Sequence, residues 1–316
     1  MVDYILRSFV ERALRENKTL GDVVLEYEQE NFRRGKKEVF KKLAESFKVF
    51  HSAIQNGLQA KYKFRNLMFS EDAKRMNHIK ARILGNTLHK ACVYALAITE
   101  NNLNMGQVIA CPTAGASGIV PGCIIAIAED YGFGEHETYK ALLTASAIEL
   151  SIVKNASISG AAHGCQAECG SATAMAAGAI IQLMNVHHVT NPEMVEHAAA
   201  LALKNTLGLV CDPVAGIVSV PCRKRNAVCV GMAFVSAQMA MAGIKSFIPF
   251  DEVASAMKEI GDSMGDELKE TARGGLAKTP TGRKWEEAKN ELLKQAREEK
   301  KSFADILYKN QRKGRR

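Results

Sequence analysis

Apolar residues recur at spacings of three and four along most of the chain, which places them on one face of an α-helix. The clearest such stripe consists of Phe40, Leu43, Phe47, Phe50, Ile54 and Leu58. Alternating apolar and polar runs rich in β-branched residues are few, and no motif repeats at a fixed period. The pattern therefore predicts an all-α fold.

One segment carries signals for both ends of a helix. In residues 191–208, Asn191 is an N-cap residue and Pro192 occupies the first helical position. Lys204 lies in the final turns, and Gly208 can adopt the left-handed conformation that stops a helix. We expect a helix between these signals.

The innermost helices are predicted to be rich in alanine and glycine. Residues 160–179 and 227–244 consist largely of small side chains, which allow helix axes to approach closely. The second segment is about as long as a bilayer is thick, but it contains Ser236 and Gln238. We therefore expect a buried core helix and no membrane span, within a compact bundle around a site at loop–helix junctions.

The formal net charge of +8 is concentrated at the C-terminus. Residues 284–316 contain eleven Lys and Arg against six Asp and Glu, so the rest of the chain is close to neutral. The Glu–Lys spacings of this segment are typical of a solvated or partner-docking helix, and we expect no nucleic-acid site. The N-terminus lacks the apolar core of a signal peptide, and eight cysteines without a disulfide framework indicate a reducing, cytoplasmic setting.

Three irregular segments, 111–122, 155–165 and 211–222, are rich in Gly, Pro, Ser and Thr. Each leads into a helix, whose free N–H groups and dipole favour anions. Cysteines at positions 165, 211 and 222 fall in or next to these loops, where the helix dipole is expected to lower a thiol pKa.

The spacings of these cysteines are 46 and 11 residues, with no C-x-x-C pair, which excludes a zinc ribbon and a thioredoxin-type motif. From spacing alone two interpretations stay open. Each cysteine is either a small buried apolar residue or one ligand of a three-cysteine metal site.

Several long motifs resemble those of a known family. They read PTAGASGIVPG, NASISGA..GCQAE.GSA.AMAA, LGLVCDPVAGIVSVPC.KRNA and ET.RGGLAKTPTGR. Together they resemble the α chain of the iron–sulfur-dependent L-serine dehydratases from about residue 20 to about residue 285. The resemblance implies an all-α catalytic chain. It also implies that Cys165, Cys211 and Cys222 bind a 4Fe–4S cluster through three of its irons.

The resemblance further implies a lyase that deaminates L-serine to pyruvate and ammonia by β-elimination. An iron without a protein ligand offers the open position that a Lewis-acid catalyst requires, here for the substrate hydroxyl. The implied catalytic residues are Thr113, Ser117, Asn155 and Ser159. The implied substrate-binding residues are Gly115, Gly118, Ser157, Gly160 and Arg273. No residue stands out by spacing as the general base.

Two arginines and one aspartate lie beside the cysteine motifs. We expect Asp212 to shape its loop by capping it, a structural role. For Arg223 and Arg225, pairing with the cluster or substrate and a plain surface position are both open.

Three positions depart from the family pattern. Cys169, four residues after Cys165, is interpreted as a buried thiol, with a fourth-ligand or oxidation role as the alternative. His163 is either a proton donor or a hydrogen-bonded loop histidine. Residues 63–75 retain Asp72 and Ala73 but lack the expected glycines. If this segment sets substrate choice, threonine and cysteine are open as substrates beside serine.

The resemblance divides the chain into an N-terminal helical segment (1–60), a catalytic iron–sulfur domain (61–283) and a basic helical tail (284–316). Long relatives carry an additional regulatory-type domain, which is absent from this sequence. We therefore predict a separate β chain as partner, in a hetero-oligomer.

Two rival functions fit parts of the sequence. A pyridoxal-phosphate dehydratase would use Lys48 of the Ser-x-Lys in residues 46–48, but this lysine belongs to the amphipathic stripe and no glycine-rich phosphate loop follows a strand. The second rival is a non-catalytic iron–sulfur redox sensor derived from the enzyme, which the changes at 63–71 and at Cys169 support.

Overall fold

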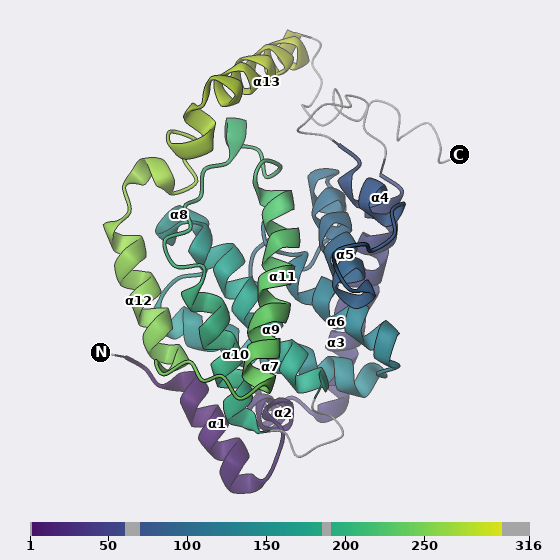
Figure 1. Ribbon diagram of the computed structural model, residues 1–316, viewed down its shortest axis with the longest axis vertical. Coiled ribbons are helices and arrows are strands. Elements are labelled where there is room, and N and C mark those ends of the chain that lie inside the picture. The colour runs from purple at the N-terminus through teal and green to yellow at the C-terminus, as the bar shows by residue number, and fades with distance from the viewer. Residues whose placement is uncertain (1, 61–69, 185–190, 299–316) are drawn as a thin grey trace.

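The computed structural model describes residues 2–60, 70–184 and 191–298. Helices dominate this part of the chain and no strand occurs in it, which confirms the all-α prediction (Figure 1). The first seven helices are α1 (Ile5–Glu16), α2 (Leu20–Phe32), α3 (Lys36–Leu58), α4 (Asp72–Asn77), α5 (Asn86–Leu103), α6 (Ile119–Tyr131) and α7 (Glu135–Asn155). They are followed by α8 (Gly160–His163), α9 (Ser171–Met184), α10 (Pro192–Lys204), α11 (Cys222–Met241), α12 (Phe250–Ser263) and α13 (Pro280–Glu298).

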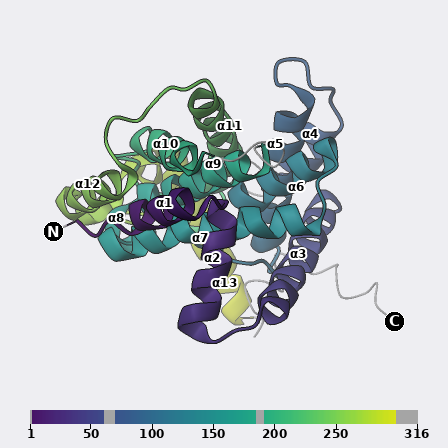
Figure 2. The ribbon, with the colours of Figure 1, turned by 90° about the horizontal axis from the view of Figure 1, so that it is seen from below.

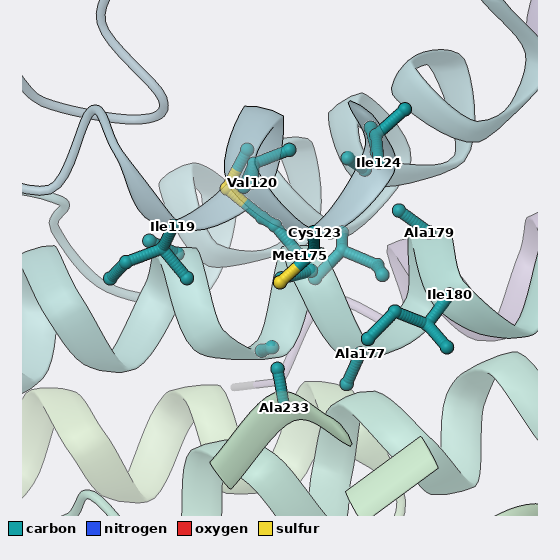
Figure 3. Packing of buried hydrophobic residues seen from close by; sticks show 14 of the residues in the cluster. Ile119, Val120, Cys123, Ile124, Met175, Ala177, Ala179, Ile180 and Ala233 are labelled. Atoms are coloured by element: carbon teal, nitrogen blue, oxygen red, sulfur yellow. The ribbon is translucent and has the colours of Figure 1, made fainter. Parts of the chain in front are cut away.

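The helix α9 is the centre of the bundle. It packs against α6, α7, α10 and α11, and nearly every one of its residues is buried. A Cβ atom added at Gly178 would lie 2.2 Å from Cδ1 of Ile148, so this helix and α7 are as close as a glycine permits. Figure 3 shows Ile119 and Cys123 of α6 above Met175 of α9, with Ala233 of α11 on the opposite side. The prediction of closely packed, Ala/Gly-rich inner helices is confirmed.

The signals expected at the N-terminus of the helix in residues 191–208 are confirmed, whereas the expectation that Gly208 stops this helix is wrong. The side chain of Asn191 accepts a hydrogen bond from the N–H of Glu193 at 3.0 Å, and α10 begins at Pro192. The helix ends at Lys204, and Gly208 has a φ of 83°. The chain passes through turns between these two residues, so the left-handed glycine stands beyond the helix end rather than at it.

The apolar stripe of residues 40–58 lies on α3, which packs mainly on α5. Lys48 lies within this helix, as expected. The segment 227–244 forms most of α11, and none of the described helices is long and apolar enough to cross a bilayer. The cytoplasmic setting stays a prediction.

The first helix, α1, is joined to α12 by hydrogen bonds. The carboxylate of Asp251 accepts hydrogen bonds from the N–H groups of Leu6 (3.0 Å) and Arg7 (3.1 Å), which caps the beginning of α1. Figure 2 shows α1 alongside α12 and α10. The predicted boundaries at residues 60 and 283 stay predictions.

The predicted C-terminal tail begins inside α13, and its residues 299–316 lie outside the described part of the chain. Trp285 packs against the short helical turn η2 (Val214–Gly216), and Nζ of Lys289 donates to the carbonyl of Ala215 at 2.6 Å. The helix α13 therefore covers the loop that carries Cys211 and Cys222.

Candidate functional site

The three glycine-rich loops meet at one end of the bundle, where Figure 1 places α8 and the beginning of α11 below α13. A Cβ atom added at Gly160 would lie 2.8 Å from the carboxylate of Glu168 and 3.2 Å from the sulfur of Cys211. One added at Gly115 would lie 3.4 Å from the same carboxylate. Residues from all three loops therefore surround Glu168.

The predicted cysteine ligands enter from two of these loops. Cys165 stands between α8 and the π-helical turn η1 (Gln166–Gly170), a local distortion that is common at functional sites. Its sulfur is in hydrogen-bonding contact with that of Cys211. Cys222 is the first residue of α11. The charges of Cys165 and Arg225 both act on the pKa of its thiol. The structure thus gathers Cys211, Cys222 and Arg225 around Cys165.

Only one of these thiols is favoured as a thiolate. Hydrogen bonds from Cys169 and then Cys211, with help from Arg225, lower the pKa of Cys165 well below its ordinary value. The Cys165 thiolate in turn raises the pKa of Cys211, and burial raises that of Cys222 to about 12. The expectation that helix dipoles lower all three pKa values is therefore wrong. In this crowded site, burial and the first negative charge outweigh the dipole.

Arg225 is a component of the site rather than a surface residue. Its guanidinium donates to the carbonyl of Val210 at 2.8 Å and to Asp212 at 3.1 Å, and it also contacts the sulfur of Cys165. Arg223, in contrast, is fully buried away from the thiols. It bonds to Glu100 at 3.2 Å and to the carbonyl of Ser70 at 2.8 Å.

Asp212 has the structural role expected for it. Its second carboxylate oxygen accepts a hydrogen bond from the N–H of Leu276 at 2.8 Å, which ties the cysteine loop to the late glycine motif. Nearby, the N–H of Cys211 donates to the carbonyl of Leu268 and the N–H of Glu270 donates to the carbonyl of Cys211, both at 2.8 Å. These bonds bring Glu270 to the sulfur site.

The sequence reasoning singled out neither Glu168 nor Glu270. Burial, the largest cause, and negative charge on Cys165 and Glu270 together raise the pKa of Glu168 to about 7. Ligand atoms of Glu168, Cys211 and Glu270 lie within 4.8 Å of one another. Their positions in the sequence could have identified them. Glu168 lies in the motif that contains Cys165, and Glu270 is the first residue of the motif ET.RGGLAKTPTGR.

Thr113 and Gly115 reach the site, whereas two other residues of their loop serve its shape. The hydroxyl of Thr113 lies by Glu168, where its influence lowers the pKa of that carboxyl. Ser117 donates to the carbonyl of Ala114 at 2.8 Å, which closes the turn. A Cβ atom at Gly118 would lie 2.4 Å from the carbonyl oxygen of Ala95, so this glycine allows the loop to pack on α5.

Asn226 of α11 holds this first loop in place and was also missed. It is fully buried, donates to the carbonyl of Gly115 at 2.8 Å and accepts from the N–H of Gly118 at 3.2 Å. An amide side chain one turn after Cys222 thus connects the cysteine helix to the loop of Thr113.

The remaining predicted residues are placed differently. Asn155 pairs with the backbone of Asp3, accepting from its N–H and donating to its carbonyl, each at 2.8 Å. Ser157 accepts from the N–H of Ser159 at 3.0 Å, and the side chains of Ser159 and Arg273 are exposed. Gly160, which was predicted with them, lies against Glu168. The catalytic or binding roles predicted for the other residues stay predictions.

Two of the three departures have clear surroundings. His163 bonds to Asp262 of α12 at 3.1 Å and packs on Gly261, as a loop histidine with a structural partner would. Cys169 is buried and contacts the thiols of Cys165 and Cys229. In the third, Asp72 and Ala73 donate their N–H groups to Glu100. Residues 63–69 lie outside the described part of the chain.

Comparison with known proteins agrees with this geometry. Residues 15–277 match the family described as "Serine dehydratase alpha chain". The chain is 41% identical over 283 residues to the probable L-serine dehydratase alpha chain of Bacillus subtilis, covering 89% of this chain and 93% of the relative. It is 43% identical to the L-serine dehydratase alpha chain of Peptoniphilus asaccharolyticus, covering 83% and 90%.

A longer relative matches over a smaller share of its length. The L-serine dehydratase of Streptomyces coelicolor is 44% identical over 58% of this chain, and the match covers 40% of that protein. With nearly the whole length of two alpha chains matched and the cysteine loops assembled as described, the chain belongs to the serine dehydratase alpha chain family.

Proposed function

We propose that this chain is the catalytic subunit of an L-serine dehydratase, which converts L-serine to pyruvate and ammonia. The observation that carries the proposal is the convergence of Cys165, Cys211 and Cys222 with Arg225 at the junction of three loops. The names of the relatives from Bacillus subtilis and Peptoniphilus asaccharolyticus support serine as the substrate.

The residues present fit a 4Fe–4S cluster. Cysteine thiolates are the usual ligands of such clusters, and three of them would leave one iron of a 4Fe–4S cluster without a protein ligand. The cationic Arg225 suits an anionic cluster, and Gly160 leaves space beside Cys211 that a Cβ atom would fill. We propose that Cys165, Cys211 and Cys222 hold it. When bound, the cluster would supply Lewis-acid activation of the hydroxyl leaving group.

The chain's own residues would bind and orient the substrate. Residues 113–118 precede α6, and the positive end of the α6 dipole favours the substrate carboxylate at this loop. The buried hydroxyl of Thr113 lies by Glu168, where it can reach a ligand bound next to that carboxylate. Asn226 fixes the loop before substrate arrives, which reduces the ordering cost of binding.

We also propose a separate β chain as partner. The relatives that this chain matches over nearly their full length are named alpha chains, whereas the match covers 40% of the longer Streptomyces coelicolor protein. The additional part of the longer relative is the natural counterpart of a second chain. The basic segment after residue 283 stays a candidate for docking.

The test is a pyruvate assay on anaerobically purified, iron- and sulfide-reconstituted protein, with and without the candidate β chain. The proposal expects pyruvate from L-serine in preference to L-threonine and L-cysteine. Preferred turnover of threonine or cysteine would transfer the proposal to that substrate. A fully loaded protein that turns over none of the three would overturn the lyase and favour the redox sensor, for which the contact between Cys169 and Cys165 is the supporting observation.

A further inference from the structure

The site contains two carboxylates without a cationic partner. Within the described residues, no lysine or arginine forms an ion pair with Glu168 or Glu270. Arg225, a basic group of the same site, is engaged with Asp212, the carbonyl of Val210 and Cys165. A half-buried carboxylate near the Cys165 thiolate carries its negative charge at a cost, which a positive group bound beside it would offset.

The chain keeps this unpaired carboxylate accessible to a ligand. Glycines at positions 115 and 160 stand against Glu168, and a side chain at either would occupy the space beside its oxygens. Glu168 is also within 3.9 Å of the Cys211 sulfur, so a molecule bound to the carboxylate would lie next to the predicted metal ligands. Space, negative charge and proximity to the reacting centre therefore coincide.

Glu270 is held at the mouth of the same site in an uncommon conformation. Its φ is 62°, in the left-handed region that residues other than glycine seldom adopt. The bond from its N–H to the carbonyl of Cys211 maintains this conformation, and its side chain is exposed. Strain of this kind in a residue whose side chain faces a cluster of ligating groups is typical of functional sites.

We propose that Glu168, assisted by Glu270, binds the α-ammonium group of the substrate and thereby restricts the site to α-amino acids. The inference rests on the proposed function and adds to it the group that recognises the amine. A primary ammonium can donate to both carboxylates at once, since their oxygens lie within 4.8 Å of each other. Serine would then be bound at its two charged ends, the carboxylate by the loop of Thr113 and the ammonium by this pair.

The test compares L-serine with L-glycerate, in which a hydroxyl replaces the ammonium group. Binding of both is measured by calorimetry on reconstituted protein of known iron content, and steady-state kinetics are measured with serine. The variants are Glu168→Gln and Glu270→Gln. The matched control is Glu149→Gln, because Glu149 is a partly buried carboxyl on α7 outside the site.

We expect Glu168→Gln to weaken serine binding and raise its KM by ~10–100-fold, the loss typical of one charged hydrogen bond, with kcat changed much less. Binding of L-glycerate should be unchanged or improved. Glu270→Gln should show a smaller effect in the same direction, since that side chain is exposed. The control should leave both ligands unaffected.

Three outcomes would overturn the inference. They are a Glu168→Gln variant that loses kcat at unchanged KM, one that weakens serine and glycerate equally, and one that loses iron. The first would make Glu168 a proton-transfer group, and the last would make it a support of the metal centre. All three outcomes are compatible with the proposed lyase function of the wild-type protein. A loaded wild-type protein without turnover, in contrast, would reject the proposed function itself.

Discussion

At the scale of single residues, the contact between Cys169 and the predicted ligand Cys165 is the most specific feature of this chain. The thiol of Cys169 contacts Cys165 and also Cys229 on α11. Cys169 therefore connects the loop site to a buried thiol of the core. A buried thiol that donates to a ligating thiolate stabilises its negative charge without being a ligand itself.

Replacement of Cys169 by alanine should therefore leave the iron content close to wild type. It should alter the visible sulfur-to-iron absorption band, because Cys165 loses a hydrogen bond. Iron and sulfide analysis together with the absorption spectrum measure both effects. Cys111→Ala, which removes another buried thiol with no sulfur contact among the described residues, is the matched control. Loss of iron in the Cys169 variant alone would identify Cys169 as a ligand.

The three cysteines were identifiable from the sequence because they stand in long loops with family-specific motifs. Their surroundings were less accessible: the sequence left Arg225 open between a cluster partner and a surface charge, and it singled out neither Asn226 nor Glu168, because these contacts depend on which helices meet. Arg223 is an example of a side chain whose partner is distant in the sequence. A basic residue next to a cysteine motif gives no sign that Glu100, more than a hundred residues away, neutralises it in the core.

At the scale of elements, the helices were predictable because their apolar spacing, caps and stop signals are all local. For the contacts between helices, the sequence predicted only that they are close. An Ala/Gly-rich segment indicates close packing but does not identify the helix against which it packs. Gly57 illustrates the difference. A Cβ atom there would lie 1.9 Å from the carbonyl oxygen of Ala97, so α3 and α5 touch at this glycine.

The substitution Gly57→Ala should consequently destabilise the protein by about 1–3 kcal/mol, because backbone atoms of α5 must move. Gly231→Ala provides the contrast, since that glycine is also helical but has no atom within 4 Å of an added Cβ. Alanine there should stabilise by about 0.5–1 kcal/mol. Urea unfolding of both variants measures the difference, and equal midpoints would contradict the close contact between α3 and α5.

At the scale of the whole molecule, the bundle places its buried core at α9 and its reactive groups at one end, beneath α13 (Figure 1). Trp285 and Lys289 fasten α13 over the turn that follows Cys211 and Asp212. The predicted tail is thus, in its first half, a cover for the cysteine loop. The sequence did not reveal this, because the charge pattern of a solvated helix does not record what its single tryptophan contacts.

The central claim is that three cysteines from two loops hold one metal centre. The most direct measurement is the iron and sulfide content of Cys165→Ser, Cys211→Ser and Cys222→Ser after anaerobic reconstitution, with Cys111→Ser as control. Each of the three variants should lose most of its bound iron, while the control should retain the wild-type amount. Wild-type iron content in all three would contradict the account.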